Sequence, residues 1–165
     1  MSSRPVLALP FRPLELALEL ASGVGLVWTV GLVLFSYASL PSSVPTHFGL
    51  GGEPDGWGPR WMMFILPAVG LVLYVVLTIM GRIPHRLNYP WAVTEANALR
   101  QYRLVRAFLG LLKMEVVLFF GYVKFTAIRV AMGNAPGLGP AFLPLFVGVT
   151  LGTILAYVIL AYRAR

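Results

Sequence analysis

The sequence predicts an all-α membrane protein with four transmembrane helices. Of its 165 residues, 58% are hydrophobic, and the mean hydropathy is +0.80, whereas soluble domains are about 45–50% apolar. Apolar segments of spanning length alternate with short polar connections, and the arginines gather in only some of these connections. A chain of this length forms one domain. We therefore expect residues 1–165 to form a single four-helix transmembrane domain.

The expected spans cover residues 18–40, 61–81, 107–130 and 142–162. Crossing about 30 Å of hydrocarbon takes roughly 20 helical residues, and each of these segments has that length. The first helix begins near Pro13, because a proline in the first turn loses no hydrogen bond. Pro67 lies about two turns into the second span and predicts a kink there.

Residues 82–106 form a basic connection that carries five arginines and a single carboxylate, Glu95. Two prolines early in this segment disfavour helix at the residues before them. Thr94 is suited to cap a helix that begins near Glu95. That helix would continue through the third span to Ala131, so its first turns would lie in water or among headgroups.

Orientation follows from the rule that Lys and Arg in short loops stay cytoplasmic. Arginines cluster at both termini and in residues 82–106, so we expect an N-in/C-in topology with residues 41–60 and 132–140 outside. A formal charge of +7 raises nucleic acid as a partner. Because these charges lie between apolar spans, anionic headgroups of the lipid bilayer are the better partner, and no nucleic acid is expected.

The outer loop, residues 41–60, is expected to be ordered. It contains four prolines and five glycines, whereas a flexible linker would combine glycine with serine. Prolines fix φ, and glycines permit turns that other residues resist. We identify a loop motif, either binding or structural, made of Pro45, His47, Gly52, Glu53, Asp55 and Gly58.

Three of these motif residues, His47, Glu53 and Asp55, could ligate a metal, since zinc accepts imidazole and carboxylate ligands. Their spacing matches no established zinc motif. In the structural alternative, the Asp55 carboxylate accepts backbone N–H bonds in a turn, and His47 bonds a carbonyl or that carboxylate. We favour the structural alternative and expect no cofactor. No set of nucleophile, base and orienting group is visible, so no catalytic residue is assigned and an enzyme is not expected.

Four charged residues fall within or beside the expected spans: Glu19, Lys113, Glu115 and Lys124. A charge at the bilayer centre costs about 2.5 kcal/mol or more. We interpret Lys113 and Lys124 as residues whose long stems let the ammonium reach an interface. Alternatively, Lys113 pairs with Glu15 or Glu19 and ties the first helix to the third. Glu115 has a shorter side chain and is the hardest of the four to explain.

Residues 45–48 (PTHF) and 52–58 (GEPDGWG), followed by an apolar span, resemble a bacterial membrane domain of unknown function. That domain also forms the N-terminal part of SdpI-type immunity proteins, and the close likeness covers about residues 30–70. The resemblance implies a multi-pass protein of the bacterial inner (plasma) membrane with this loop outside the cytoplasm. In SdpI-type proteins it would also imply protection against a secreted toxin and control of a cytoplasmic repressor. Those proteins carry further helices after the domain, whereas four are expected here.

The sequence therefore predicts a small, non-catalytic integral membrane protein that acts by protein–protein interaction, in immunity or signalling. The outer loop would meet an extracellular peptide or another membrane protein chain. Two alternatives stay open, an accessory subunit of a larger membrane complex and a metal-dependent membrane enzyme that uses the loop motif. Gly23, Gly25 and Gly31 would allow close helix contacts in each case.

Overall fold

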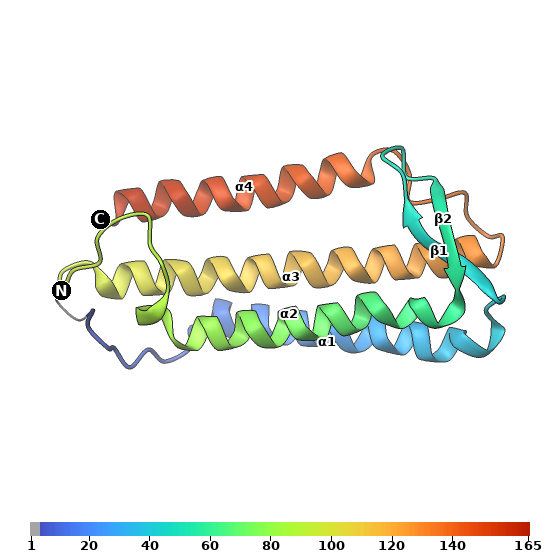
Figure 1. The fold of residues 1–165 in the computed structure, drawn as a ribbon. Helices are drawn as coiled ribbons and strands as arrows, with labels where there is room; N and C mark the ends of the chain where they lie inside the picture. Colours follow the sequence, from blue (N-terminus) through green and yellow to red (C-terminus); the bar gives the residue numbers. More distant parts are fainter. Residues whose placement is uncertain (1–3) are drawn as a thin grey trace.

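The computed structural model describes residues 4–165 and is mainly helical, with one small antiparallel sheet (Figure 1). Its two strands pair with each other in the connection between the first two helices. The elements, in chain order, are α1 (Pro13–Ser36), η1 (Tyr37–Ser39), β1 (Ser43–Phe48), β2 (Pro54–Pro59), η2 (Arg60–Phe64), α2 (Ile65–Arg82), η3 (Pro84–Arg86), α3 (Ala98–Ala131) and α4 (Phe142–Arg163), where η marks a short 3₁₀ helix.

The helices lie side by side in an elongated bundle whose two ends differ (Figure 1). The β1–β2 hairpin and the connection between α3 and α4 occupy one end. The N-terminal segment, the connection between α2 and α3 and the C-terminus occupy the other. Hereafter the hairpin end is called the outer end and the opposite end the inner end.

Three helices are long and apolar enough to cross a membrane, which indicates a membrane protein. They cover Pro13–Ser39, Arg60–Arg82 and Phe142–Arg163. α3 has 34 residues, ample length for a span, but its charges set it apart from the other three. That α3 also crosses the membrane, as the third of the four expected spans, is therefore developed below as a proposal.

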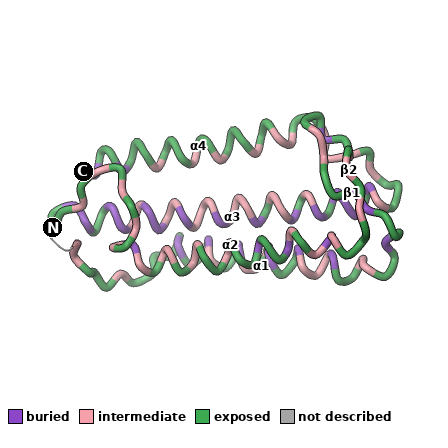
Figure 2. Tube along the Cα trace, in the orientation of Figure 1, coloured by how far each residue is buried: buried purple, intermediate pink, exposed green. Residues whose placement is uncertain are grey.

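α3 lies at the centre of the bundle, in contact with α1, α2 and α4. Buried positions follow almost its whole length, whereas α4 is mostly exposed (Figure 2). α1 and α3 approach closely at Gly25, where an added Cβ would lie 2.9 Å from a methyl carbon of Val117. This position is one of the small residues expected to allow close contact.

The outward faces of α1, α2 and α4 are covered by large apolar side chains, as expected for helices that face lipid. Exposed examples are Leu20, Val24 and Val27 on α1, Leu71, Val72 and Ile79 on α2, and Leu145, Leu151, Leu155 and Leu160 on α4. α3 therefore supplies the interior of the bundle, and the other three helices supply its apolar surface.

The second helix starts as the 3₁₀ turn η2 and becomes α-helical at Ile65, so Pro67, where the sequence predicts a kink, stands in the first α turn. One expectation about helix ends is wrong. α3 starts at Ala98 and not near Glu95. Thr94 does not cap it, because residues 94–97 form a turn in which the Asn97 side chain accepts the Thr94 N–H at 2.8 Å.

Candidate functional site

The outer loop is ordered, and its structure is a β-hairpin, which the sequence analysis did not predict. Glycine and proline are depleted in strands, so their density argued against strand structure here. Both strands of a two-stranded sheet are edges, however, and an edge tolerates proline. Pro45 pairs with Trp57, and His47 pairs with Gly56, with irregularities in the register on both sides of His47.

The hairpin is anchored in the outer end of the bundle. Val44 is fully buried and packs in one cluster with Leu40, Met63, Val33 and the outer residues of α3. A backbone hydrogen bond of 3.1 Å from the Arg60 N–H to the Ser42 carbonyl closes the base of the hairpin. Burial of these aliphatic side chains stabilises the hairpin against the helices, so it is not a free flap.

Two motif residues meet on the hairpin. Nδ1 of His47 lies 2.5 Å from Oδ1 of Asp55, and the two side chains are 74% and 48% exposed. The strands lie close together beside this contact, and Gly56 permits the approach because an added Cβ there would lie 2.9 Å from the His47 Cβ. The structural alternative, a His47–Asp55 contact, is therefore present in the structure. Asp55 fixes the orientation of an imidazole that faces solvent.

The remaining motif residues shape the hairpin. Pro45 is fully buried, and a Cβ on Gly58 would lie 2.6 Å from the Met62 sulfur, so this position must stay small. Glu53 accepts the Gly49 N–H through its backbone carbonyl at 2.8 Å and closes the turn. Within residues 4–165, no three His, Asp or Glu side chains are gathered so that they could hold a metal ion.

Gly52 joins the hairpin to the α3–α4 connection. Its φ is +87°, a conformation in which glycine carries no steric cost. A Cβ on Gly52 would lie 2.6 Å from the Gly139 carbonyl oxygen, and the Leu138 N–H donates to the Gly52 carbonyl at 2.7 Å. The sequence analysis placed both connections outside the membrane but gave no sign that they touch.

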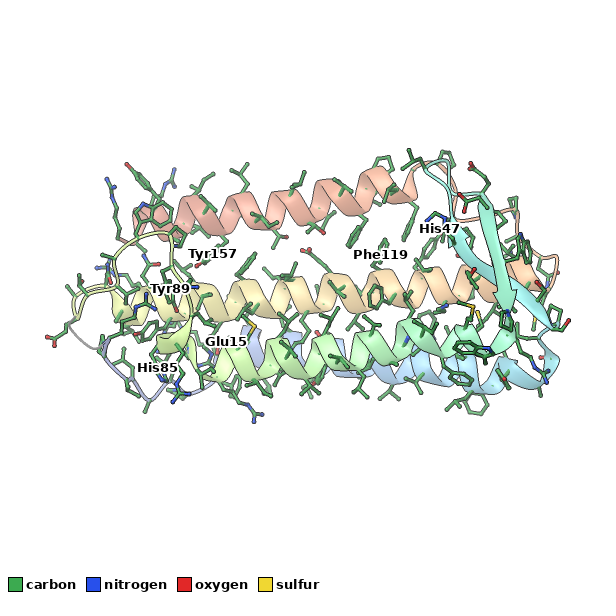
Figure 3. All side chains as sticks on the ribbon, in the orientation of Figure 1. Glu15, His47, His85, Tyr89, Phe119 and Tyr157 are labelled. Carbon is green, nitrogen blue, oxygen red and sulfur yellow. The ribbon has the colours of Figure 1, made fainter. Side chains whose placement is uncertain are left out.

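A cavity of about 200 Å³ lies beneath the hairpin, between it and the outer ends of α3 and α4. Its walls are mostly apolar. Phe119 stacks on Phe142 with ring centroids 5.0 Å apart, and His47 lies at the rim above Phe119 (Figure 3). The outer end thus offers a small apolar cavity with an oriented imidazole at its edge.

Exposed apolar side chains also lie on the hairpin and on the 3₁₀ turn that follows it. Leu50 at the hairpin tip is 83% exposed, and Trp57 and Trp61 are 53% and 57% exposed. Tryptophan is common both at membrane interfaces and at protein interfaces, and Leu50 adds an exposed aliphatic side chain at the hairpin tip.

The charged residues of the spans form ion pairs inside the bundle. Lys113, 2% exposed, lies 2.5 Å from the Glu19 carboxylate. Its ammonium also donates to the Thr78 hydroxyl at 2.8 Å and lies 4.7 Å from the Tyr74 ring centroid. The interpretation of Lys113 as reaching an interface is therefore wrong. The alternative, a link between the first and third helices, is the one that the structure shows.

A second pair lies nearer the inner end. Arg106 contacts Glu15 at 2.8 Å, and both side chains are 6% exposed. Arg106 also donates to the Leu9 carbonyl at 2.9 Å, and its guanidinium lies over the Phe11 ring. This pair fastens the start of α1 and the segment before it to α3.

Lys124, near the outer end of α3, is 6% exposed, so it too does not reach the membrane interface as interpreted from sequence. Its ammonium lies 3.8 Å from the Met63 sulfur, and among residues 4–165 it forms no ion pair. A snorkelling lysine needs an open path to water. Lys124 is instead buried beside Met63 of η2 without such a path, which is the physical reason for the error.

Glu115 faces α4. One carboxylate oxygen accepts the Thr153 hydroxyl at 2.5 Å, and the other is buried without a hydrogen-bond partner in the described part of the chain, as is the nearby Thr150 hydroxyl. Glu115 therefore has only one polar contact to α4, in contrast to the multiple partners of Glu19.

Comparisons with known proteins place the hairpin inside a recognised domain. Residues 24–71 match a domain of unknown function, DUF1648, a stretch that runs from α1 through the hairpin into α2. The chain is also similar to a protein of Archaeoglobus fulgidus described as an uncharacterized protein. The two are 33% identical over 112 residues, which are 61% of this chain and 60% of that protein. No solved structure matches the chain.

Proposed function

We propose that this chain is a non-catalytic, multi-pass membrane protein that binds a partner protein or peptide through its outer hairpin. The observation that carries the proposal is the presentation of Leu50, His47 and Trp57 on a hairpin held rigid at its base and tip. Ordered exposed aromatic and aliphatic side chains over an apolar cavity are typical of interaction sites. The DUF1648 match, residues 24–71, includes the hairpin that carries these side chains.

The proposed topology has four spans, N-in and C-in, in which α3 crosses the membrane together with α1, α2 and α4. At the outer end of α3, the hairpin packs on the helix through the buried Val44. The α3–α4 connection is tied to the hairpin by the Leu138–Gly52 hydrogen bond. Inside the bundle, Lys113 has a carboxylate partner, which lowers the cost of placing its charge in hydrocarbon. α3 can therefore cross the membrane although its sequence is less apolar than that of its neighbours.

The likeness to SdpI-type proteins suggests where such a protein would act. We propose the plasma membrane, the inner membrane in a bacterium, with a secreted peptide as one class of partner for the hairpin. The basic inner connection would then pass the binding signal to a cytoplasmic regulator. The chain spans 60% of the length of its archaeal relative. These roles are proposed for this chain and not for the whole of that protein.

Site-specific photo-crosslinking in native membranes tests the binding proposal. A photoreactive residue replaces Leu50 in the full chain, and a matched control places it at Asn134, which is exposed at the same end. We expect a discrete crosslinked product from position 50 and none from position 134. The product should be lost when Asp55→Ala removes the group that orients His47. Equal products from both positions, or none from either, would contradict the proposal.

The same membranes separate the alternatives. Fixed stoichiometry with other chains after mild-detergent purification, together with instability of the isolated chain, would favour an accessory subunit. About one metal ion per chain, lost in His47→Ala, would favour a metal-dependent enzyme.

A further inference from the structure

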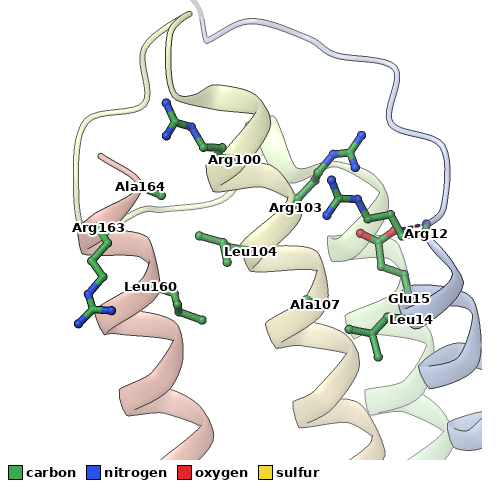
Figure 4. A pocket seen from close by; sticks show the side chains of 10 residues that line it. All are labelled: Arg12, Leu14, Glu15, Arg100, Arg103, Leu104, Ala107, Leu160, Arg163 and Ala164. Atoms are coloured by element: carbon green, nitrogen blue, oxygen red, sulfur yellow. Dashed lines mark hydrogen bonds between the residues drawn. The ribbon is translucent and has the colours of Figure 1, made fainter.

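A cavity of about 390 Å³ opens at the inner end, between the first turns of α1 and α3 and the last turn of α4. Four arginines line it, one from the start of α1, two from α3 and one from α4, together with the Glu15 carboxylate (Figure 4). These arginines are Arg12, Arg100, Arg103 and Arg163. They come from segments far apart in the sequence, so only the folded bundle brings them together.

The cavity carries uncompensated positive charge. Glu15 is already held by Arg106, at 2.8 Å. Among residues 4–165, none of the four lining arginines forms an ion pair, and Nε of Arg103 is buried without a hydrogen-bond partner. Guanidinium groups gathered at a low-dielectric boundary repel one another and favour a bound anion.

An apolar groove continues from this cavity toward the middle of the bundle. It has a volume of about 350 Å³, lies between α3 and α4, and shares Leu104, Ala107 and Leu160 with the basic cavity. Figure 4 shows Leu104 and Leu160 pointing toward one another between the two helices. The groove extends along α3 to Leu111, about 10 Å deeper at 1.5 Å per residue.

The basic cavity and the apolar groove together match an amphiphile with an anionic head and an apolar tail. Arginine binds phosphate oxygens through paired N–H donors in a fixed planar arrangement. Basic pockets between transmembrane helices are a known setting for phospholipid headgroups. A soluble anion would use the arginines but not the groove, and a neutral lipid would use the groove but leave the arginines uncompensated.

We propose that the inner cavity and the α3–α4 groove form a binding site for one anionic phospholipid. The phosphate is bound by arginines of the inner cavity, Arg100 and Arg103 among them, and one acyl chain lies in the groove against Phe108 and Leu111. The lipid would fill the space between α3 and α4 and hold α4 against α3. This site is separate from the hairpin and does not depend on its partner.

Native mass spectrometry of the full chain, purified from bilayers that contain phosphatidylglycerol and phosphatidylcholine, measures retained lipid. Wild-type chain should retain one phosphatidylglycerol per chain. The double variant Arg100→Gln/Arg103→Gln should weaken retention by about tenfold or more, because it removes two phosphate contacts. The control Arg82→Gln/Arg86→Gln removes two exposed arginines of the same end that do not line the cavity, and retention should not change.

A second pair of variants tests the groove. Gly152 lines it, Gly148 on the same helix does not, and an added Cβ at either residue meets no atom within 4 Å. Gly152→Leu should therefore lower lipid retention several-fold by filling the groove, whereas Gly148→Leu should leave it unchanged. Equal retention in both would show that no acyl chain lies there and would overturn the proposal.

Two further measurements keep the test decisive if a variant fails to fold. Soluble glycerol phosphate should not displace the bound lipid from wild-type chain, and displacement at millimolar concentration would indicate a phosphate site only. Phosphatidylglycerol with a photoreactive group in its acyl chain should label peptides that contain residues 104–111 and 149–160. Uniform labelling of all the outward helix faces, or equal loss of retention in the Arg82/Arg86 control, would show general bilayer contact instead.

Discussion

The two sides of α3 are built differently. Toward α1 and α2, the side chains of Lys113 and Arg106 are buried in ion pairs with further hydrogen-bond partners. Toward α4, Glu115 has one hydrogen bond and a second oxygen without a partner within the described residues. α4 is held at its ends, where Leu138 bonds Gly52 and where the Gln101 side chain donates to the Ala161 carbonyl at 2.8 Å.

This difference teaches how a charged helix can lie within an apolar bundle. A buried ion pair gains little net stability over apolar packing, but removing one partner is costly. On the α1–α2 side of α3, the charges of Lys113 and Arg106 therefore each depend on a carboxylate partner. The α4 side depends on few polar contacts, which agrees with a groove that a lipid could fill.

The largest expected effect comes from breaking the α1–α3 ion pair. Lys113→Met should lower the free energy of unfolding by about 3 kcal/mol, because Glu19 is left as a largely buried charge without its partner. Denaturant titration in mild detergent measures this. The double variant Glu19→Gln/Lys113→Met removes both charges and should recover at least half of the loss. No recovery would mean that Lys113 acts through packing alone.

A smaller effect is expected where α4 is tied to the hairpin. In Gly137→Ala, the new methyl group would overlap the Gly52 carbonyl oxygen, so the α3–α4 connection must move away from the hairpin. We expect a loss of about 2 kcal/mol and faster proteolysis in residues 132–140. Gly133→Ala is the matched control in the same connection. Its φ is +74°, so alanine meets backbone strain there, but an added Cβ meets no atom within 4 Å. It should cost less and leave the hairpin contact intact.

The inner end of the α4 side should weaken at high pH. Burial raises the pKa of the Tyr89 phenol above its usual value of 10, with smaller contributions from the phenols of Tyr157 and Tyr102. Because the folded pKa is the higher one, the protonated phenol favours folding at every pH below 10, and this stability is lost as the pH rises through the folded value. Spectrophotometric titration should show one late-titrating tyrosine fewer in Tyr89→Phe than in the wild-type chain. An unchanged number of late-titrating tyrosines in that variant would contradict this assignment.

The smallest effect should come from Glu115. Glu115→Gln keeps an acceptor for the Thr153 hydroxyl and removes a charge with only one polar contact. The free energy of unfolding should change by less than about 1 kcal/mol, against the much larger loss in Lys113→Met. A loss as large as that of Lys113→Met would show that the two sides of α3 are equally dependent on their charges and would break the comparison.

Much of the helical framework could be predicted from the sequence, because apolar length is a strong signal. The expected spans 61–81 and 142–162 fall within helices that are long and apolar enough to cross a membrane, and the span 18–40 overruns the end of the first such helix by one residue. The start of α3 could not be placed, because Thr94 and Asn97 are both suited to a helix N-terminus and only the turn geometry distinguishes them.

Only part of the candidate site could be predicted from the sequence. The contact between His47 and Asp55 was expected as one alternative, since the two side chains lie close in the chain. The strand pairing is local but was obscured by the prolines and glycines of the loop. The cavity above Phe119 and the Gly52–Leu138 hydrogen bond bring together residues more than 80 positions apart. No local pattern predicts such contacts. The four arginines of the inner cavity were seen only as a basic surface for the same reason.

The central claim is that α3 crosses the membrane, and cysteine accessibility tests it most directly. The chain contains no cysteine, so single substitutions give no background. Leu50→Cys, Arg86→Cys and Asn134→Cys are exposed to a membrane-impermeant thiol reagent in intact cells, with permeabilised cells as the reference. We predict labelling of positions 50 and 134 from outside and of position 86 only after permeabilisation. If position 134 is labelled only together with position 86, α3 does not cross the membrane and the proposed topology is wrong.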